Sequence, residues 1–419
     1  MSGKVAQATD AASGPFEHLR ASLSALDERV LAGFFALATW VVYRLSYQGE
    51  GAPFNYFTRL ADAYLHGRTD LIEQPSWLSE LIPRDGKWYV VFPPMPAFLA
   101  VPFVRVFGTD VAQPEISILV GAASAGVAFL VLDRWFPRSV AIWSTILWAV
   151  GTNYWYHAEV GSAWYYAQIC AALFVWLALL EGATRSRPHV IGLLVGCAFL
   201  CRVTTIGALV FFVVLHHEQF LRGGLQQWRA LRPDLRQLGL LAAGLAPAFA
   251  VAAWYNNTRF GSPTEFGYDL IPGVLNEPWY RHGLVSHSYV GEHLDEMFTA
   301  LPRFQSDWPF AVPNIYTMAI WVTTPALVLI VLAPLRNRLT VAAWGGVAGI
   351  VPFLLTHGGN GFSQFGNRFS IDYLPFLVLL MAAGMRSRPA WPAQGLVVFS
   401  VAVNVWGVVM ISGLHHYSF

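Results

Sequence analysis

Charged residues are scarce in this sequence of 419 residues. Asp, Glu, Lys and Arg together make up 12% of the chain, whereas soluble domains carry about 25%. Hydrophobic residues make up 55%, and the mean hydropathy is +0.47. This composition excludes an ordinary soluble domain and predicts an all-α polytopic membrane protein. Because the net charge is only +1, nothing in the composition indicates a nucleic-acid partner.

Cysteine is scarce as well. Cys170, Cys197 and Cys201 all lie in apolar runs and fit neither a zinc-ligand spacing nor a disulfide framework, so we expect buried thiols. The polar first 29 residues lack the charged-then-apolar pattern of a signal peptide. We therefore expect a cytoplasmic tail over residues 1–29 and a single transmembrane domain over 30–419.

Long apolar runs are abundant, and nine of them could cross about 30 Å of hydrocarbon. They lie near 30–47, 116–132, 140–155, 163–180, 238–255, 313–334, 339–356, 371–385 and 393–413. Two further stretches are ambiguous. Residues 93–107 are short and hold four prolines, and residues 189–217 are too long for one simple span and are interrupted by Arg202.

The distribution of Lys and Arg favours one topology. We place the N-terminus in the cytoplasm, let 93–107 dip into the membrane and return, and treat 189–217 as a hairpin with Arg202 at its tip. Of the 26 Lys and Arg residues, 15 then lie inside, 9 outside and 2 within spans, as the positive-inside rule requires. The prediction is a bundle of about eleven membrane segments in the plasma membrane, with long outer loops at 48–115 and 256–312.

The first outer loop predicts an amphipathic helix at the membrane interface. Apolar residues recur there at helical spacing, with Arg59 and Asp62 on the polar positions and Gly67 at the end. A turn at Asp85-Gly86, a short aromatic strand and the proline-opened re-entrant segment follow. A simple lid or interfacial anchor would account for the helix equally well.

These features together resemble the GT-C superfamily of multi-spanning glycosyltransferases, which use polyprenyl-phosphate sugars. The amphipathic helix is followed by "PPMP" opening the re-entrant segment, and "VIGLLVGCAFLCRVTT", "QFGNRFSIDYLPFL" and "NNTRFGSPTEFGYDL" are similar to other patterns of the superfamily. The superfamily includes protein O-mannosyltransferases and aminoarabinose transferases, and the chain resembles their bacterial relatives. The resemblance implies a GT-C-like bundle and sugar transfer from a polyprenyl-phosphate donor to a glycan, lipid or protein acceptor at the extracytoplasmic face.

The resemblance also implies a catalytic carboxylate just after the first span, where many members carry Asp-Glu or a single Asp. This chain has no such pair. Glu50 lies nearest that place and Asp62 follows one helix later, so both are candidates for the base that takes the acceptor proton, with Asp85 behind them. Asp62 could equally form a surface pair with Arg59, and Glu50 could be an ordinary loop acid.

The departing lipid phosphate would need cations, and Arg202, Arg368 and Arg59 are the candidates. Arg202 lies in an apolar run, where a charge costs several kcal/mol unless it has a partner or reaches water. Arg368 precedes Asp372 by four residues, so the two would share a face and pair if this stretch is α-helical. A purely structural ion pair remains the alternative for both arginines.

The stretch "NYWYHAEVGSAWYY" clusters aromatic residues around His157, Glu159 and Trp164. Aromatic faces with a few polar groups suit sugar rings, so these residues, with Tyr89 and Asp372, form the predicted sugar and acceptor site. An interfacial aromatic belt would have the same composition. The histidines of the second outer loop fit no metal-ligand pattern, so a divalent cation has no support in the sequence.

Two other functional classes would use similar surfaces. A transporter or flippase for lipid-linked glycans usually shows internal repeats, and none is visible here. A polymerase or ligase would carry its large outer loop late in the chain, whereas the larger loop of this chain is the first; the loop at 256–312 keeps this alternative open. The sequence therefore favours the glycosyltransferase.

Overall fold

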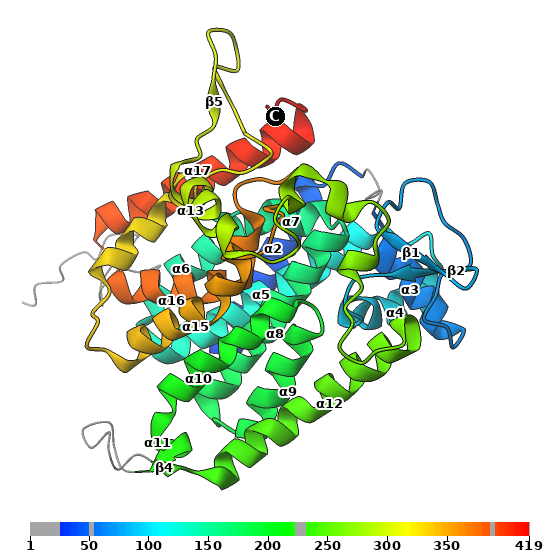
Figure 1. Cartoon of the computed structure of the whole chain (residues 1–419). Helices are drawn as coiled ribbons and strands as arrows, with labels where there is room; N and C mark the ends of the chain where they lie inside the picture. The colour runs from blue at the N-terminus through cyan, green and yellow to red at the C-terminus, as the bar shows by residue number, and fades with distance from the viewer. Residues whose placement is uncertain (1–25, 50–53, 223–231, 386–389, 419) are drawn as a thin grey trace, which may run out of the picture.

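The structure is a computed structural model that describes residues 26–49, 54–222, 232–385 and 390–418. Within these ranges, six helices are long and apolar enough to cross a membrane (Figure 1). They are α2 (Glu28–Ser46), α5 (Gln113–Trp135), α8 (Ala163–Thr184), α12 (Leu235–Phe260), α15 (Arg338–Leu355) and α17 (Trp391–Val408) with its continuation η9 (Val409–Gly413). The predicted multi-pass helical membrane protein is confirmed. Glu50 and most of the predicted tail lie outside the described residues.

Several further apolar helices are shorter. They are α4 (Met95–Phe107), α6 (Arg138–Val150), α9 (Pro188–Phe199), η1 (Val203–Ala208) with α10 (Leu209–Leu215), and α16 (Leu374–Gly384). A helix of 13 residues such as α6 is about 20 Å long, less than the hydrocarbon thickness. The count of about eleven membrane segments therefore stays a prediction.

Two predicted continuous spans are interrupted. The run 140–155 divides at Gly151, where α6 has ended and the short helix α7 (Tyr154–Val160) begins three residues later. The run 313–334 forms only α14 (Ile320–Thr323) and the 3-10 segment η7 (Pro325–Leu332). Pro325 disfavours α-helical geometry at Thr324, which has φ −138° and ψ 72°.

Helices α5, α8 and α16 are largely buried: α5 packs against α8, and α16 packs against α6, α15 and η7 (Figure 1). In α16 every residue except Ala383 is buried. A helix that is apolar all round needs such a position. Gly126 of α5 lets α2 pack closely, because a Cβ there would lie 2.8 Å from the Ala32 carbonyl oxygen.

The predicted break at Arg202 is present between α9 and η1. The two legs pack against different partners, α9 against α12 and α10 against α15. Glycines permit both contacts: a Cβ at Gly192 would lie 2.3 Å from the Leu241 carbonyl oxygen, and one at Gly207 would lie 2.1 Å from that of Gly349. Below α10 in Figure 1, the chain continues into α11 (His217–Phe220) and the two-residue strands β3 (Leu221–Arg222) and β4 (Arg232–Pro233).

The helix, the turn and the strand predicted for the first outer loop are present, while the re-entrant segment stays a prediction. Helix α3 (Tyr56–Leu65) is followed by Gly67 at φ +69°. Strands β1 (Leu81–Arg84) and β2 (Lys87–Val90) pair antiparallel, and Asp85 and Gly86 connect them with φ of 52° and 69°. Positive φ at both central residues is the signature of a type I′ hairpin turn.

Helix α3 is more buried than a free interfacial helix would be. It packs on α4, and Tyr56, Phe57 and Leu60 are fully buried in a second core shared with the hairpin. The Met95 N–H at the start of α4 donates to the Leu200 carbonyl, 3.1 Å away, at the tip of α9. The segment predicted as the first outer loop is therefore attached to the Arg202 break.

The segment predicted as the second outer loop, 256–312, is mostly irregular. It consists of η3 (Tyr268–Leu270), η4 (Val274–Asn276), η5 (Pro278–Tyr280), η6 (His287–Tyr289), α13 (Val290–Thr299), β5 (Arg303–Phe304) and β6 (Ala311–Val312). The β5–β6 hairpin projects from the bundle (Figure 1). Near α7 and α8, the 3-10 helix η8 (Arg368–Asp372) leads into α16.

Candidate functional site

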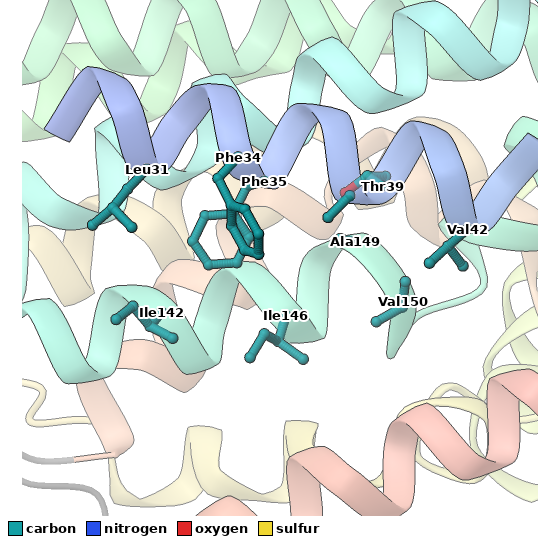
Figure 2. Close-up of a pocket in the computed structure, with 10 residues that line it drawn as sticks. Leu31, Phe34, Phe35, Thr39, Val42, Ile142, Ile146, Ala149 and Val150 are labelled. Carbon is teal, nitrogen blue, oxygen red and sulfur yellow. The ribbon is translucent and has the colours of Figure 1, made fainter. Parts of the chain in front are cut away.

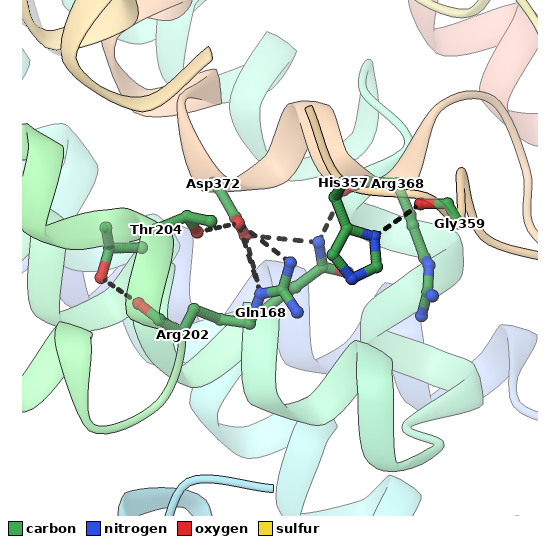
Figure 3. Close-up of polar contacts among 8 residues, drawn as sticks. Gln168, Arg202, Thr204, His357, Gly359, Arg368 and Asp372 are labelled. Carbon is green, nitrogen blue, oxygen red and sulfur yellow. Dashed lines mark hydrogen bonds and ion pairs between the residues drawn. The ribbon is translucent and has the colours of Figure 1, made fainter. Parts of the chain in front are cut away.

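Asp372 and Arg202 form a buried ion pair between η8 and the α9–η1 break. Arg202 Nη2 lies 3.2 Å from Asp372 Oδ2, and the Asp372 side chain is fully buried. Thr204 Oγ1 donates to the same oxygen at 2.6 Å, and Gln168 Nε2 lies 3.3 Å from Oδ1. Figure 3 shows the carboxylate surrounded by these three side chains. Asp372 therefore has its hydrogen-bonding capacity occupied by protein groups.

Arg368 does not pair with Asp372, contrary to the α-helical reading of this stretch. Residues 368–372 form a 3-10 helix, in which residues three apart, not four, share a face. The Arg368 side chain points away from Asp372 (Figure 3), and its Nε is buried without a hydrogen-bond partner in the described structure. Its guanidinium lies 5.8 Å from the ring centroids of Trp164 and Tyr165.

One aromatic ring connects the two arginines. The Phe369 centroid lies 5.5 Å from the Arg202 guanidinium carbon and 5.1 Å from that of Arg368. Aromatic faces stabilise cations without neutralising them. Two guanidinium groups thus share one buried neighbourhood, and only Arg202 has a carboxylate partner there.

Glu80, which the sequence reasoning overlooked, completes this neighbourhood. Trp164 Nε1 donates to Glu80 Oε2 at 3.1 Å, and the Glu80 N–H donates to the Tyr56 hydroxyl at 2.9 Å. Burial raises the pKa of Glu80 from 4.5 to about 7, although the Trp164 hydrogen bond and the charge of Arg368 oppose that rise. The site therefore combines two cations, one paired carboxylate and one carboxyl group that titrates near neutral pH.

His157 lies one layer behind Arg368. Its Nδ1 donates to the Asn153 carbonyl at 2.7 Å. Its ring packs edge to face with the ring of Tyr165, with 4.5 Å between the two ring centroids. Burial lowers the pKa of His157 to about 3, so the imidazole is neutral at physiological pH. With Nδ1 carrying the proton, the buried Nε2 is a hydrogen-bond acceptor.

Glu159 belongs to the same short helix but points elsewhere. Ser412 Oγ of η9 donates to Glu159 Oε1 at 2.8 Å, and Ser46 at the end of α2 also hydrogen-bonds the carboxyl group. Burial raises the pKa of Glu159 to about 7, more than these two hydrogen bonds lower it. Glu159 thus joins three helix ends instead of facing Arg368.

Glu159→Gln is expected to change how stability depends on pH. In the folded protein Glu159 binds its proton more tightly than at its ordinary pKa of 4.5. The contribution of protonated Glu159 to the free energy of unfolding is therefore fully present below pH 4.5 and is lost as pH rises to about 7. The variant should gain on the order of 2 kcal/mol over wild type at pH 8 and little at pH 4.5. Melting temperatures of the detergent-purified proteins at both pH values, with the exposed Glu73→Gln as control, test this; the same pH dependence in all three would contradict it.

Asp62 and Arg59 lie in a separate surface hollow with Arg68 and Glu73. Asp62 lies 3.6 Å from His66 Nδ1, and Arg59 stacks on Trp77 at 5.4 Å instead of pairing with Asp62. The contacts of Tyr89 also lie away from the Arg202–Arg368 site: Tyr89 is buried on β2 and packs edge to face with Phe260. The roles assigned to these residues from the sequence stay predictions.

The structure therefore brings together half of the predicted site. The residues that meet are Arg202, Arg368, Trp164, Asp372 and His157, and the additional members are Glu80, Gln168 and Thr204. No local motif singles out the additional residues, because each is recruited by packing between distant segments. Among the described residues no group of three or more His, Cys, Asp or Glu could hold a metal ion.

An apolar groove lies apart from this site, between α2 and α6 (Figure 2). Its volume is about 270 Å³, and Leu31, Phe34, Phe35, Ile142 and Ile146 are among its lining residues. With Thr39 as its single polar lining residue, the groove offers no chemistry beyond apolar contact.

The fold and the site together define a polytopic helical membrane protein with a buried, cation-rich aromatic site. Neither a known protein family nor a curated protein matches the sequence. The fold does match the crystal structure of ArnT from Cupriavidus metallidurans bound to undecaprenyl phosphate, with a TM-score of 0.53 and 16% identity over 89% of this chain and 62% of that one. This likeness confirms the predicted GT-C fold.

Archaeal oligosaccharyltransferase AglB from Archaeoglobus fulgidus, in complex with an inhibitory peptide and a dolichol-phosphate, gives a TM-score of 0.47 at 12% identity. That match covers 97% of this chain and 57% of AglB. This chain thus spans less than two thirds of the length of each of these proteins.

Proposed function

We propose that this protein is a lipid-phosphate-dependent glycosyltransferase in which Arg368 holds the phosphate of a polyprenyl-phosphate sugar. The observation that carries the proposal is the state of Arg368: its guanidinium is half-buried, its buried Nε has no hydrogen-bond partner, and no carboxylate forms an ion pair with it in the described structure. A cation that buries an unpartnered nitrogen in this way is costly unless an anion completes its surroundings. A phosphate group would do so through charge-assisted hydrogen bonds.

The surroundings of Arg368 suit a sugar attached to that phosphate. Trp164 and Tyr165 offer aromatic faces next to the guanidinium. His157 Nε2 and Gln168 Oε1 are buried acceptors without partners in the described residues, and sugar hydroxyls are donors that could satisfy them. Arg202, held by Asp372, adds positive potential without needing to contact the lipid.

The proposed chemistry takes place at the extracytoplasmic end of the bundle, in a plasma membrane with the N-terminus inside. In this arrangement residues 93–107 enter the membrane and return, and α4 with the α9–η1 break forms the floor of the site. The Met95–Leu200 hydrogen bond supports this contact. The acceptor is a hydroxyl group of a glycan, lipid or protein.

Arg368→Gln is expected to weaken the binding of undecaprenyl phosphate by about 10- to 100-fold, because it removes charge-assisted hydrogen bonds to the phosphate. The matched control is Arg281→Gln, which removes the same charge from a half-exposed pair with Glu292. Binding to the purified protein in nanodiscs would be measured for both variants. Wild-type affinity in Arg368→Gln, or equal losses in the two variants, would contradict the proposal.

Turnover is tested separately by offering the wild-type protein a panel of polyprenyl-phosphate sugars. Release of the lipid phosphate coupled to sugar transfer is the expected result. Movement of an intact lipid-linked sugar across a vesicle membrane without transfer would instead identify a flippase.

A further inference from the structure

The position of Glu80 distinguishes it from every other carboxylate described near the site. Glu80 Oε2 accepts from Trp164 Nε1 at 3.1 Å, and the Trp164 ring in turn faces Arg368, with 5.8 Å between the ring centroid and the guanidinium carbon. One indole therefore separates a carboxylate from the buried cation that lacks a carboxylate partner. Glu80 is also only partly buried by the protein, so a ligand can reach it.

The backbone holds Glu80 in this place. Its N–H donates to the hydroxyl of Tyr56, which is fully buried in α3. The following residues, Leu81 and Ile82, are buried in β1 and anchor the chain from the other side. Because the backbone is held on both sides of Glu80, its carboxylate stays at a fixed distance from Arg368. Acid–base catalysis requires such fixed positioning of the catalytic group.

We propose that Glu80 is the general base of this enzyme, in place of the carboxylates that the sequence pattern indicates. The inference rests on the proposed glycosyltransferase function. In the step, the acceptor oxygen forms a bond to the anomeric carbon, and its proton passes to the Glu80 carboxylate. The bond between the anomeric carbon and the phosphate oxygen breaks, and its electron pair leaves with the lipid phosphate held by Arg368.

Neither Asp372, inside the site, nor Asp62, outside it, fits this role. Asp372 is fully buried and bonded to Arg202, Thr204 and Gln168. Asp62 lies in the hollow beside His66, and no contact in the described structure joins it to Arg368.

The electrostatic surroundings of Glu80 suit a base at neutral pH. A base is most effective when its pKa lies near the working pH, and burial raises the pKa of Glu80 to about 7. The groups that face it are Arg368, Glu277, Tyr56, Tyr268, Tyr280 and the Trp164 N–H. Arg368 and the indole favour the ionised form, while Glu277 opposes it.

The first test compares Glu80→Gln, Asp62→Asn and the exposed control Glu73→Gln. Each variant is measured for kcat with the donor that the panel identifies and for affinity toward undecaprenyl phosphate. Glu80→Gln should lower kcat by about 10²- to 10⁴-fold, the usual contribution of a general base, while its affinity stays within about threefold of wild type. Retained turnover in Glu80→Gln, or loss of turnover in Asp62→Asn alone, would overturn the proposal.

The second test uses the pH profile, which a merely structural Glu80 would not control. In wild type, kcat/KM should rise with pH to a plateau above about 7 as Glu80 loses its proton. Trp164→Phe removes the hydrogen bond that lowers the Glu80 pKa, so the rising limb should move to higher pH. An unmoved limb in Trp164→Phe would count against Glu80.

The two proposals fail in different ways. If wild-type protein neither binds undecaprenyl phosphate nor turns over any donor, the glycosyltransferase function itself is wrong. If wild type binds and turns over while Glu80→Gln does both equally well, only the assignment of the base is wrong.

Discussion

Asp372→Leu is expected to lower the free energy of unfolding by about 3–5 kcal/mol, because it leaves the Arg202 charge buried without its carboxylate. Arg202 retains 18% side-chain exposure and Asp372 none, so water cannot readily replace the lost partner. The substitution also removes the acceptor of the Thr204 hydroxyl. Equilibrium unfolding of the detergent-purified protein measures the loss.

The double variant Arg202→Met/Asp372→Leu distinguishes the cost of losing the ion pair from the cost of leaving one charge unpaired. Removing both charges leaves no uncompensated ion, so the double variant should recover most of the stability that Asp372→Leu loses. The half-exposed pair of Arg281 and Glu292 is the comparison, since breaking a solvated pair costs less than about 1 kcal/mol. A loss below 1 kcal/mol in Asp372→Leu would show that Arg202 reaches water or another partner.

Gly207→Val is expected to destabilise the protein by about 3 kcal/mol, the upper end of the usual cost of overpacking. A Cβ at Gly207 would lie 2.1 Å from the Gly349 carbonyl oxygen, and the contact is reciprocal, with 2.2 Å from a Gly349 Cβ to the Gly207 oxygen. Both neighbours are backbone atoms, so η1 must move away from α15 as a unit. Because Thr204 is in η1, this displacement should also weaken its hydrogen bond to Asp372.

The control for this prediction is Gly395→Val on α17, where a Cβ would meet no atom within 4 Å. Thermal denaturation and lipid phosphate binding are measured for both variants. The Gly395 variant should differ little from wild type. Similar melting temperatures for the two variants would mean that η1 and α15 can separate without cost.

The local features of the first outer loop were predictable because neighbouring residues determine them. Helical spacing and Gly67 predicted α3 and its end, and Asp85-Gly86 predicted the hairpin turn. The degree of burial of α3 was not predictable. It depends on α4, whose residues pack over the face that the pattern assigned to the membrane surface.

In the candidate site, too, some features were predictable from the local sequence and others depended on packing between distant segments. Arg202 stands out in the sequence because it interrupts an apolar run, and its need for a partner could be anticipated. Its partner, Asp372, is 170 residues away, and the four-residue spacing to Arg368 pointed to a different pair. Glu80 carried no signal at all, since its environment is made by Trp164 and Arg368 from two other parts of the chain.

The sequence by itself determined that the chain is a multi-pass helical membrane protein, because hydrophobicity and turn propensity act over short stretches. It also determined most of the long spans and the break at Arg202. Only the tertiary structure decided that Arg202 is the arginine that pairs with a carboxylate and that Glu80 lies across the Trp164 ring from Arg368. That outcome depends on the 3-10 geometry of η8 and on close packing at glycines, which bring together side chains far apart in the chain.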